Sequence, residues 1–339
     1  MYNVGIIGCG AIFNRHVTSI KNNKNFRLVA ICDIDKNISK DFGKNLKVKH
    51  YSDHKDLSRD KEVNFVVVAS PNYFHYEHSI TALENNCDVL IEKPVSFESI
   101  DIEKIQEVAD KNNQKAYCVL QVRLNNSVKI VKEALRKNLL GEIRGISFVQ
   151  RWQRPYEYFS GWRNSKKIGG GTLYEVGIHY LDIIQLLFGV PDIVATKLYQ
   201  TKHKNSNIED TIYSIFDYGS FGGTAEITVS AEPKNLECSI QIIGSNGYLK
   251  IGGKALNVIE TYNFLSNGAQ IKFEQILENN NSTNEVFNNY GSYLGSCPNH
   301  SDVYKNIETF NLSEAKSGIE FIEKIYEKAN VQYKREDNF

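Results

Sequence analysis

Two short segments carry side chains that could do acid–base chemistry, and the first contains a lysine. Glu92, Lys93 and Pro94 follow the apolar run at 89–91, at the carboxyl end of a predicted strand. Open α/β sheets bind ligands at that edge. Pro94 restricts the backbone of Lys93 and so aims its amine. An amine held there can accept or donate a proton during a reaction.

The second segment contains a histidine. Glu175, His179 and Asp182 recur at i, i+4 and i+7, which places them on one face of a helix predicted to begin near residue 175. Gly189 and Pro191 end this helix. Its other face is apolar and consists of Val176, Tyr180, Ile183, Ile184 and Leu187. The pattern predicts that the apolar face is buried in a core and that the polar face carries chemistry.

A nucleotide-binding turn is predicted at the N-terminus. Gly8 and Gly10 follow the first apolar run; the first glycine permits a tight turn, and the second lets the backbone approach a pyrophosphate. Ala11 and Ile12 come next, where the start of a helix offers N–H donors to an anion. Asp33 ends the second strand, about 20 residues after the turn, where a ribose-binding carboxylate is expected. A carboxylate there repels a 2′-phosphate, so the predicted cofactor is NAD and not NADP.

The elements that must position these residues fall into two sets. Up to about residue 120, short apolar runs alternate with helical stretches, which is typical of a parallel sheet covered on both faces. Beyond residue 142, strands follow one another closely, which predicts an open, mainly antiparallel sheet. These strands are expected at 146–152, 193–200, 211–218, 223–231, 236–243 and 247–251, followed by a loop at 275–300 and a closing helix at 313–330. We therefore predict an α/β protein with a Rossmann domain at 1–122 and a substrate-binding and oligomerisation domain at 123–339.

Composition narrows the function classes. The 339 residues include 40 basic and 40 acidic side chains, and this balance argues against general binding to nucleic acid or to acidic membranes. The N-terminus lacks a basic region followed by a long apolar stretch, and no apolar run approaches 18 residues, so we expect a cytoplasmic protein without a membrane span. The six cysteines have no metal-ligand spacing, and no metal is predicted.

Four motifs, taken in order, resemble one oxidoreductase family. They are Ser70-Pro71-Asn72, Glu92-Lys93-Pro94, Gln121-Val122-Arg123, and Gly169-Gly170-Gly171 ahead of the segment from Glu175 to Asp182. Together they resemble the Gfo/Idh/MocA family over nearly the whole chain. The resemblance implies a dehydrogenase in which Lys93 and His179 are the catalytic pair. It also implies cofactor contacts at Ser70, Asn72, His75, Glu92, Lys93, Gln121, Trp162 and Arg163, in addition to those of the glycine turn.

In the mechanism that this resemblance implies, Lys93 removes a hydroxyl proton while a hydride leaves the same carbon for NAD. His179 hydrogen-bonds that hydroxyl and helps to share the proton. Asn72 flanks the nicotinamide ribose, and Arg163 approaches the carboxamide or the substrate.

The substrate signal lies at 151–167, where cations alternate with aromatic rings. The cations are Arg151, Arg154, Arg163, Lys166 and Lys167, and the rings are Trp152, Tyr156, Tyr158, Phe159 and Trp162. Cations for phosphate beside rings for base stacking favour a nucleotide-sugar, although part of the segment could be a solvated edge strand and loop. The predicted substrate contacts are Lys93, Arg123, Arg151, Arg154, Tyr156, Glu175, His179 and His300.

The segments 121–125 and 299–304 further resemble the branch that oxidises the 3-hydroxyl of UDP-N-acetylglucosamine or its uronic acid. That resemblance implies a downstream aminotransferase and a pathway to 2,3-diamino sugars of surface polysaccharide or lipid A. Asn125 and Asn126 stand where that branch commonly has His-Pro. The family resemblance also implies a homo-oligomer, a dimer or a tetramer, formed through the open face of the second sheet.

Other functions stay open at this point. An inositol or free-sugar dehydrogenase, or a 3-ketosugar reductase, would use the same two catalytic residues. Redox-neutral glycoside cleavage with retained NAD also occurs on this fold. A regulatory protein that binds NAD without turnover is the non-enzyme alternative, and it would need neither Lys93 nor His179.

Overall fold

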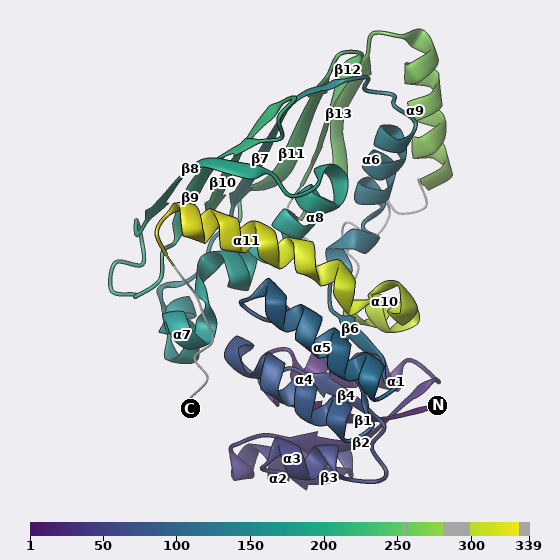
Figure 1. Ribbon diagram of the computed structural model, residues 1–339, viewed down its shortest axis with the longest axis vertical. Coiled ribbons are helices and arrows are strands. Elements are labelled where there is room, and N and C mark those ends of the chain that lie inside the picture. The colour runs from purple at the N-terminus through teal and green to yellow at the C-terminus, as the bar shows by residue number, and fades with distance from the viewer. Residues whose placement is uncertain (254, 281–298, 332–339) are drawn as a thin grey trace.

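The computed structural model describes residues 1–253, 255–280 and 299–331. Figure 1 shows two sheets, one in the N-terminal part of the chain and a larger one at the other end of the long axis, with helices between them. The first sheet is parallel and the second mainly antiparallel, so the predicted α/β fold is confirmed.

The N-terminal sheet has the strand order β3-β2-β1-β4-β5-β6. Its central strands are mostly apolar because helices cover both faces; β4, for example, is fully buried, whereas the edge strand β3 is polar and largely exposed. The order reverses between β1 and β4, and such a switch point is where dinucleotides bind. The strands are β1 (Tyr2–Ile7), β2 (Phe26–Cys32), β3 (Lys49–Tyr51), β4 (Phe65–Val68), β5 (Asp88–Ile91) and β6 (Ala116–Cys118). The helices are α1 (Phe13–Lys21), α2 (Lys36–Leu46), α3 (His54–Ser58), α4 (His75–Glu84) and α5 (Ser99–Lys111).

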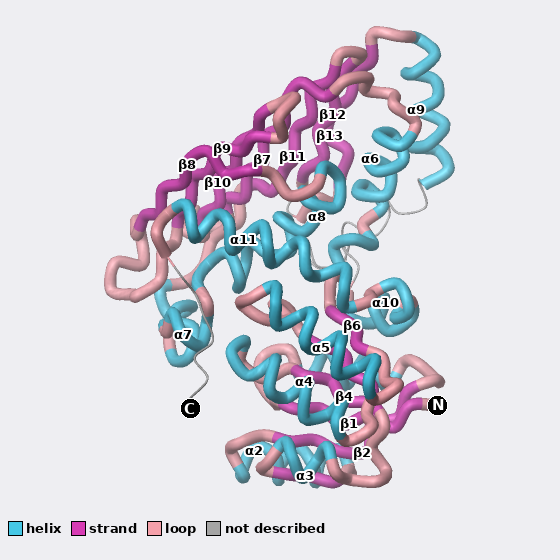
Figure 2. Tube along the Cα trace, viewed as in Figure 1, coloured by secondary structure: helices cyan, strands magenta, loops and turns pink. Residues whose placement is uncertain are grey.

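The C-terminal sheet has the order β13-β12-β11-β7-β10-β9-β8, in which only the β7–β10 pair is parallel among the described strands. Figure 2 shows helices on one face of this sheet. The strands are β7 (Ile143–Arg151), β8 (Asp192–Tyr199), β9 (Thr211–Asp217), β10 (Gly222–Thr228), β11 (Glu237–Gly244), β12 (Gly247–Gly252) and β13 (Val258–Phe264). The remaining helices are α6 (Asn126–Arg136), α7 (Lys166–Gly169), α8 (Ile178–Phe188), α9 (Asn267–Asn280), α10 (His300–Lys305) and α11 (Lys316–Lys328).

The predicted strands of this sheet all form, but β13 was not anticipated. The loop predicted at 275–300 is wrong for its first residues, because α9 continues to Asn280. Ala269, Phe273 and Ile276 are buried at helical spacing, and this periodicity outweighs the polar composition. The rest of the predicted loop, 281–298, lies outside the described residues.

The segment 299–315 returns to the N-terminal sheet. α10 packs against α1, and the Asn23 side-chain amide just after α1 donates to the Tyr304 carbonyl (3.2 Å). Further along the segment, the Phe310 carbonyl accepts the Cys118 N–H of β6 (3.0 Å). α11 packs against α8 and β8 and also against α5 (Figure 1). The end of the chain therefore joins the two sheets, and the domain boundary at residue 122 stays a prediction.

No helix among the described residues is long and apolar enough to cross a membrane.

One buried ion pair ties the end of the first sheet to α8. Arg123, in the helical turn that follows β6, donates through Nη2 and Nε to the two carboxylate oxygens of Asp182, at 2.6 and 2.7 Å. Its Nη1 donates to the Glu314 carboxylate at 2.8 Å. The guanidinium is thus occupied by two carboxylates, and Asp182 is 1% exposed.

Replacing Arg123 by Met should lower the free energy of unfolding by about 3–5 kcal/mol, because Asp182 would keep a buried charge without a cationic partner. Urea unfolding followed by tryptophan fluorescence measures the loss. Arg136→Met is the matched control, because the Arg136–Glu133 pair lies on the surface of α6 and should contribute almost nothing. Equal free energies of unfolding for the two variants would contradict a structural role for the Arg123–Asp182 ion pair.

Candidate active site

The glycine turn is built for close approach of a ligand to the backbone. Gly8 has φ +102°, and a Cβ there would lie 2.4 Å from the Ala69 carbonyl oxygen. Gly10 is exposed, and a Cβ there would meet nothing within 4 Å among the described atoms. The Cys9 N–H between them donates to Asp33 Oδ2 at 2.9 Å, which fixes the carboxylate beside the turn. These residues fit a dinucleotide, because Gly10 would leave room for the pyrophosphate and Asp33 would accept hydrogen bonds from the ribose.

Phe13 occupies the position where glycine or alanine usually lets the helix approach the sheet. The ring is fully buried, and its centroid lies 4.8 Å from that of Phe42. Two aromatic rings therefore fill the space next to α1.

The catalytic end joins the two halves of the chain through Glu175. Lys93, just after β5, donates through Nζ to the Glu175 carbonyl oxygen at 2.7 Å. The Glu175 carboxylate accepts from Arg163 Nε (2.9 Å), the Tyr158 hydroxyl (3.1 Å) and Asn72 Nδ2 (3.2 Å). Burial raises the pKa of Glu175, but Lys93 and Arg163 outweigh it and hold that pKa below its usual range. A buried carboxylate therefore stays charged between two cations.

A π-helical turn shapes the backbone around Glu175. Residues Leu173–Gly177 form a π-helical turn that leads into α8, where His179 lies. A π turn spreads five residues over one turn and is frequent at functional sites. The three residues expected on one helical face therefore have different surroundings. Glu175 lies in the π turn, His179 and Asp182 lie in α8, and Asp182 is paired with Arg123.

His179 is a neutral ring poised beside Lys93. Burial, and next the Lys93 ammonium, lower the pKa of His179 to about 3. Its Nδ1 is buried and has no hydrogen-bond partner among the described residues. A neutral imidazole with an open nitrogen can share the proton of a bound hydroxyl.

A second buried carboxylate, Glu92, lies next to Lys93 in the sequence. Its Oε1 lies 2.9 Å from Nε2 of His16 and 2.7 Å from Nε2 of His300, while Oε2 accepts the Lys93 backbone N–H at 3.2 Å. His16 Nδ1 also lies 3.0 Å from the Tyr304 hydroxyl. Sequence analysis missed His16 and Tyr304. The available signal was a histidine on the apolar face of α1, beside Val17 and Ile20.

Of the other predicted cofactor residues, Ser70, Asn72 and His75 follow β4 and Gln121 follows β6, at the same edge of the sheet. Asn72 also donates to the Gly169 carbonyl at 2.9 Å. The ring nitrogens of His75 lie 2.6 Å from the Pro94 carbonyl and 2.8 Å from the Ser70 carbonyl, so His75 ties these two turns together. Gln121 Oε1 is buried and unpartnered within the described ranges, which leaves an acceptor for a ligand N–H or hydroxyl.

The arginines of the basic segment 151–167 differ in whether a carboxylate pairs with them. Arg154 lies 4.7 Å above the Trp152 ring and 5.2 Å from the Tyr158 ring, whereas Arg163 stacks on Trp162 at 4.4 Å and is paired with Glu175. Arg151 forms ion pairs with Glu226 at 2.6 Å and with Glu237 at 3.3 Å. In the described part of the chain no carboxylate pairs with Arg154. The guanidiniums of Arg123 and Arg151 both have carboxylate partners. The substrate roles predicted for these two residues stay predictions.

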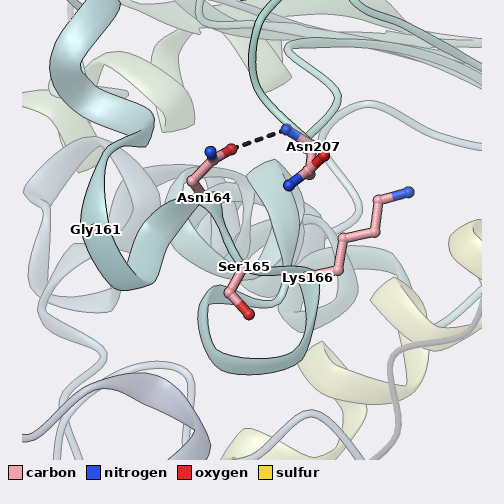
Figure 3. Close-up of a pocket in the computed structure, with 5 residues that line it drawn as sticks. All are labelled: Gly161, Asn164, Ser165, Lys166 and Asn207. Carbon is pink, nitrogen blue, oxygen red and sulfur yellow. Dashed lines mark hydrogen bonds between the residues drawn. The ribbon is translucent and has the colours of Figure 1, made fainter.

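A polar cavity of about 530 Å³ opens beside this segment. Figure 3 shows its lining, which includes Lys166 and the Asn207 N–H that donates to Asn164 Oδ1 at 2.8 Å. Gly161 and Ser165 complete the lining. Tyr156, predicted as a substrate contact, is 68% exposed nearby, and its ring centroid lies 4.9 Å from Lys202 Nζ.

Comparison with known proteins decides the family. Residues 2–120 match the model of the oxidoreductase family with an NAD-binding Rossmann fold, and residues 128–250 match the GFO/IDH/MocA C-terminal domain. The chain belongs to the Gfo/Idh/MocA oxidoreductase family. The predicted enzyme class and the predicted cofactor, NAD, are thereby confirmed.

The three relatives described next share less than 30% sequence identity with this Gfo/Idh/MocA protein. Glucose-6-phosphate 3-dehydrogenase of Bacillus subtilis (strain 168) is 29% identical over 245 residues, which span 71% of this chain and 69% of the relative. Two solved WlbA dehydrogenases in complex with NADH and UDP-GlcNAcA share the fold. The Bordetella pertussis structure has a TM-score of 0.83 and 22% identity and covers 97% of this chain and 96% of its own. The Chromobacterium violaceum structure has a TM-score of 0.84 and 24% identity and covers 97% and 94%.

Replacing Gly10 by Ala should weaken NAD binding roughly tenfold or more without changing stability, because the new methyl group meets no protein atom but occupies the space of the pyrophosphate. NAD affinity by calorimetry and the thermal unfolding midpoint measure the two effects. Gly268→Ala, on the exposed side of α9, is the matched control and should leave NAD affinity unchanged. Wild-type NAD affinity in Gly10→Ala would refute the placement of the cofactor.

Proposed function

We propose that this enzyme oxidises the 3-hydroxyl of a UDP-N-acetyl-hexosamine, or of its uronic acid, with NAD as hydride acceptor. The observation that carries the proposal is the meeting of Lys93 and His179, from different halves of the chain, around Glu175. The availability of Arg154 beside aromatic rings supports an anionic, ring-bearing substrate.

The proposed proton path uses only these two side chains. A bound NAD would supply the hydride acceptor. Lys93 first releases its own proton, then accepts the hydroxyl proton and becomes an ammonium again, while the Glu175 carbonyl accepts an N–H of the same amine in either protonation state. His179 stays neutral at physiological pH because of its low pKa, so it can hydrogen-bond the hydroxyl without repelling Lys93. The C–H and O–H bonds break and the carbonyl forms, so electrons and protons balance.

A sugar 6-phosphate is the second candidate substrate. It offers an anion to Arg154 but no base to stack, and the Bacillus subtilis relative acts on such a sugar by name. Inositol and neutral free sugars would leave Arg154 without an anion. A regulatory protein would not need Lys93 and His179 so placed.

Two partners follow from the proposal. A 3-keto product calls for an enzyme that consumes a ketone, and we propose an aminotransferase in surface polysaccharide or lipid A sugar synthesis. We also propose a homo-oligomer formed through the open face of the larger sheet, where Val194, Tyr213, Ile215 and Tyr248 are each about half exposed.

The proposal is tested by incubating the protein with NAD and, separately, UDP-GlcNAc, UDP-GlcNAcA, glucose 6-phosphate, glucose and myo-inositol. Single-turnover NADH absorbance and product mass are measured, because retained NAD would hide steady turnover. Oxidation of a UDP-sugar, with a product two hydrogens lighter, is expected. NADH formed only from glucose or inositol would overturn the choice of substrate, and no NADH from any sugar would overturn the function.

Replacing Lys93 by Met should abolish turnover while leaving NAD bound, since the amine moves the proton and the glycine turn holds the cofactor. NADH formation and NAD affinity are measured in parallel. Lys104→Met, on the surface of α5, is the control and should turn over normally. Near-normal turnover by Lys93→Met would remove Lys93 from the mechanism.

Replacing Arg154 by Met should raise KM for the anionic substrate about tenfold to a hundredfold, which is the value of a charge-assisted hydrogen bond. Its effect on a neutral analogue should be small. Arg151→Met is the matched control, because Glu226 and Glu237 already occupy that guanidinium. Steady-state kinetics on both variants separate the cases. Equal rises in KM would show that Arg154 plays no special part in substrate binding.

A further inference from the structure

Four buried residues form a hydrogen-bonded group that we call the Glu92 cluster, namely His16, Glu92, His300 and Tyr304. It brings together α1, the end of β5 and α10. His16 is fully buried, and Glu92 and His300 are 6% and 4% exposed. Both imidazoles contact the same oxygen, Glu92 Oε1, at 2.9 and 2.7 Å, and the other oxygen receives the Lys93 N–H. The cluster is therefore fastened to the backbone of the catalytic lysine.

Hydrogen-bond accounting assigns Nε2 of both rings as the donor to Glu92. Burial raises the pKa of Glu92, but the two imidazoles hold it well below its usual range, so Glu92 is a charged acceptor. Each histidine must then donate through Nε2, and the Nδ1 of a neutral ring becomes an acceptor. His16 Nδ1 is satisfied by the Tyr304 hydroxyl at 3.0 Å. His300 Nδ1 is buried and has no partner within the described ranges.

An unsatisfied buried acceptor is costly and calls for an explanation. The location of His300 supplies one, because its Nε2 is hydrogen-bonded to Glu92, the residue before Lys93. We propose that His300 Nδ1 is a ligand-binding acceptor of the catalytic centre and receives a hydrogen bond from a hydroxyl or amide N–H of the bound nicotinamide nucleoside or of the sugar. This inference rests on the proposed function, because it places both ligands at Lys93 and His179.

The rest of the Glu92 cluster has a positioning role. The Glu92 carboxylate keeps the proton of His300 on Nε2, which leaves Nδ1 bare for the ligand, in the way that an outer carboxylate orients a ligating histidine. His16 and Tyr304 hold Glu92 in place from the α1 side. Helix α10 thus reaches the catalytic centre through one side chain, although it lies about 200 residues after Lys93 in the sequence.

Three variants separate binding from packing. His300→Gln keeps one donor for Glu92 and one acceptor for the ligand, whereas His300→Leu keeps neither. Tyr304→Phe removes only the outer hydrogen bond to His16 and serves as the control. NAD affinity is measured by calorimetry without sugar, KM and kcat for the oxidised sugar are measured at saturating NAD, and the thermal unfolding midpoint is recorded for each variant.

His300→Leu should lose about tenfold in affinity for the ligand that supplies the donor, and His300→Gln should recover most of that loss. Tyr304→Phe should unfold at a lower temperature and lose much less ligand affinity than His300→Leu, because it keeps the His300 acceptor. A loss of NAD affinity identifies the nicotinamide nucleoside as the donor, and a loss confined to the sugar KM identifies the sugar. Wild-type binding of both ligands by His300→Leu, or equal losses in His300→Leu and His300→Gln, would overturn the proposal.

Nitrogen-15 NMR of the histidine-labelled wild-type protein tests the tautomer even if His300→Leu does not fold. The His300 Nδ1 signal, assigned by its loss in His300→Gln, should be that of an unprotonated nitrogen and should move upfield when the ligand binds. A protonated Nδ1 would overturn the proposal. The NAD titration stands even if no sugar is oxidised, so failure of the proposed function and failure of this inference are distinguishable.

Discussion

The whole site depends on keeping Glu175 charged while it is buried between the two halves of the chain. A buried carboxylate without partners would take up a proton or destabilise the fold. Glu175 avoids this by accepting hydrogen bonds from Asn72, Tyr158 and Arg163, while its carbonyl holds Lys93. Glu175 thus joins Asn72 and Lys93 from the first half of the chain to the segment that leads into His179, and Lys93 and His179 are the proposed catalytic pair.

The two buried carboxylates beside Lys93 are compensated in different ways. Glu175 lies between cations, whereas the partners of Glu92 are two imidazoles and a backbone N–H. Lys93 is therefore held on one side through its amine and on the other through its backbone. Such double anchoring limits the motion of the amine relative to a bound hydroxyl, and proton transfer is sensitive to that distance.

The sequence alone predicted the parallel and antiparallel sheets, because apolar runs and their spacing are local signals. It also predicted the glycine turn with Asp33, whose residues lie close together along the first two strands. Distant partners were beyond its reach. The partner of Arg151, Glu226, lies 75 residues away, so local charge could not reveal that this guanidinium is paired. His300 was predicted as a substrate contact, but its burial and its hydrogen bond to Glu92, 208 residues away, could not be predicted. The loop predicted at 275–300 began too early because composition was given more weight than helical periodicity.

The central claim is that an amine and an imidazole, brought together by Glu175, face one reacting carbon over the nicotinamide. A crystal structure of the protein with NAD and the oxidised sugar measures this most directly. The account predicts that Lys93 Nζ and a His179 ring nitrogen both lie about 3 Å from the same sugar oxygen, with the nicotinamide ring stacked against that carbon. A nicotinamide ring bound away from Lys93, or an adenosine site filled by protein side chains, would contradict it.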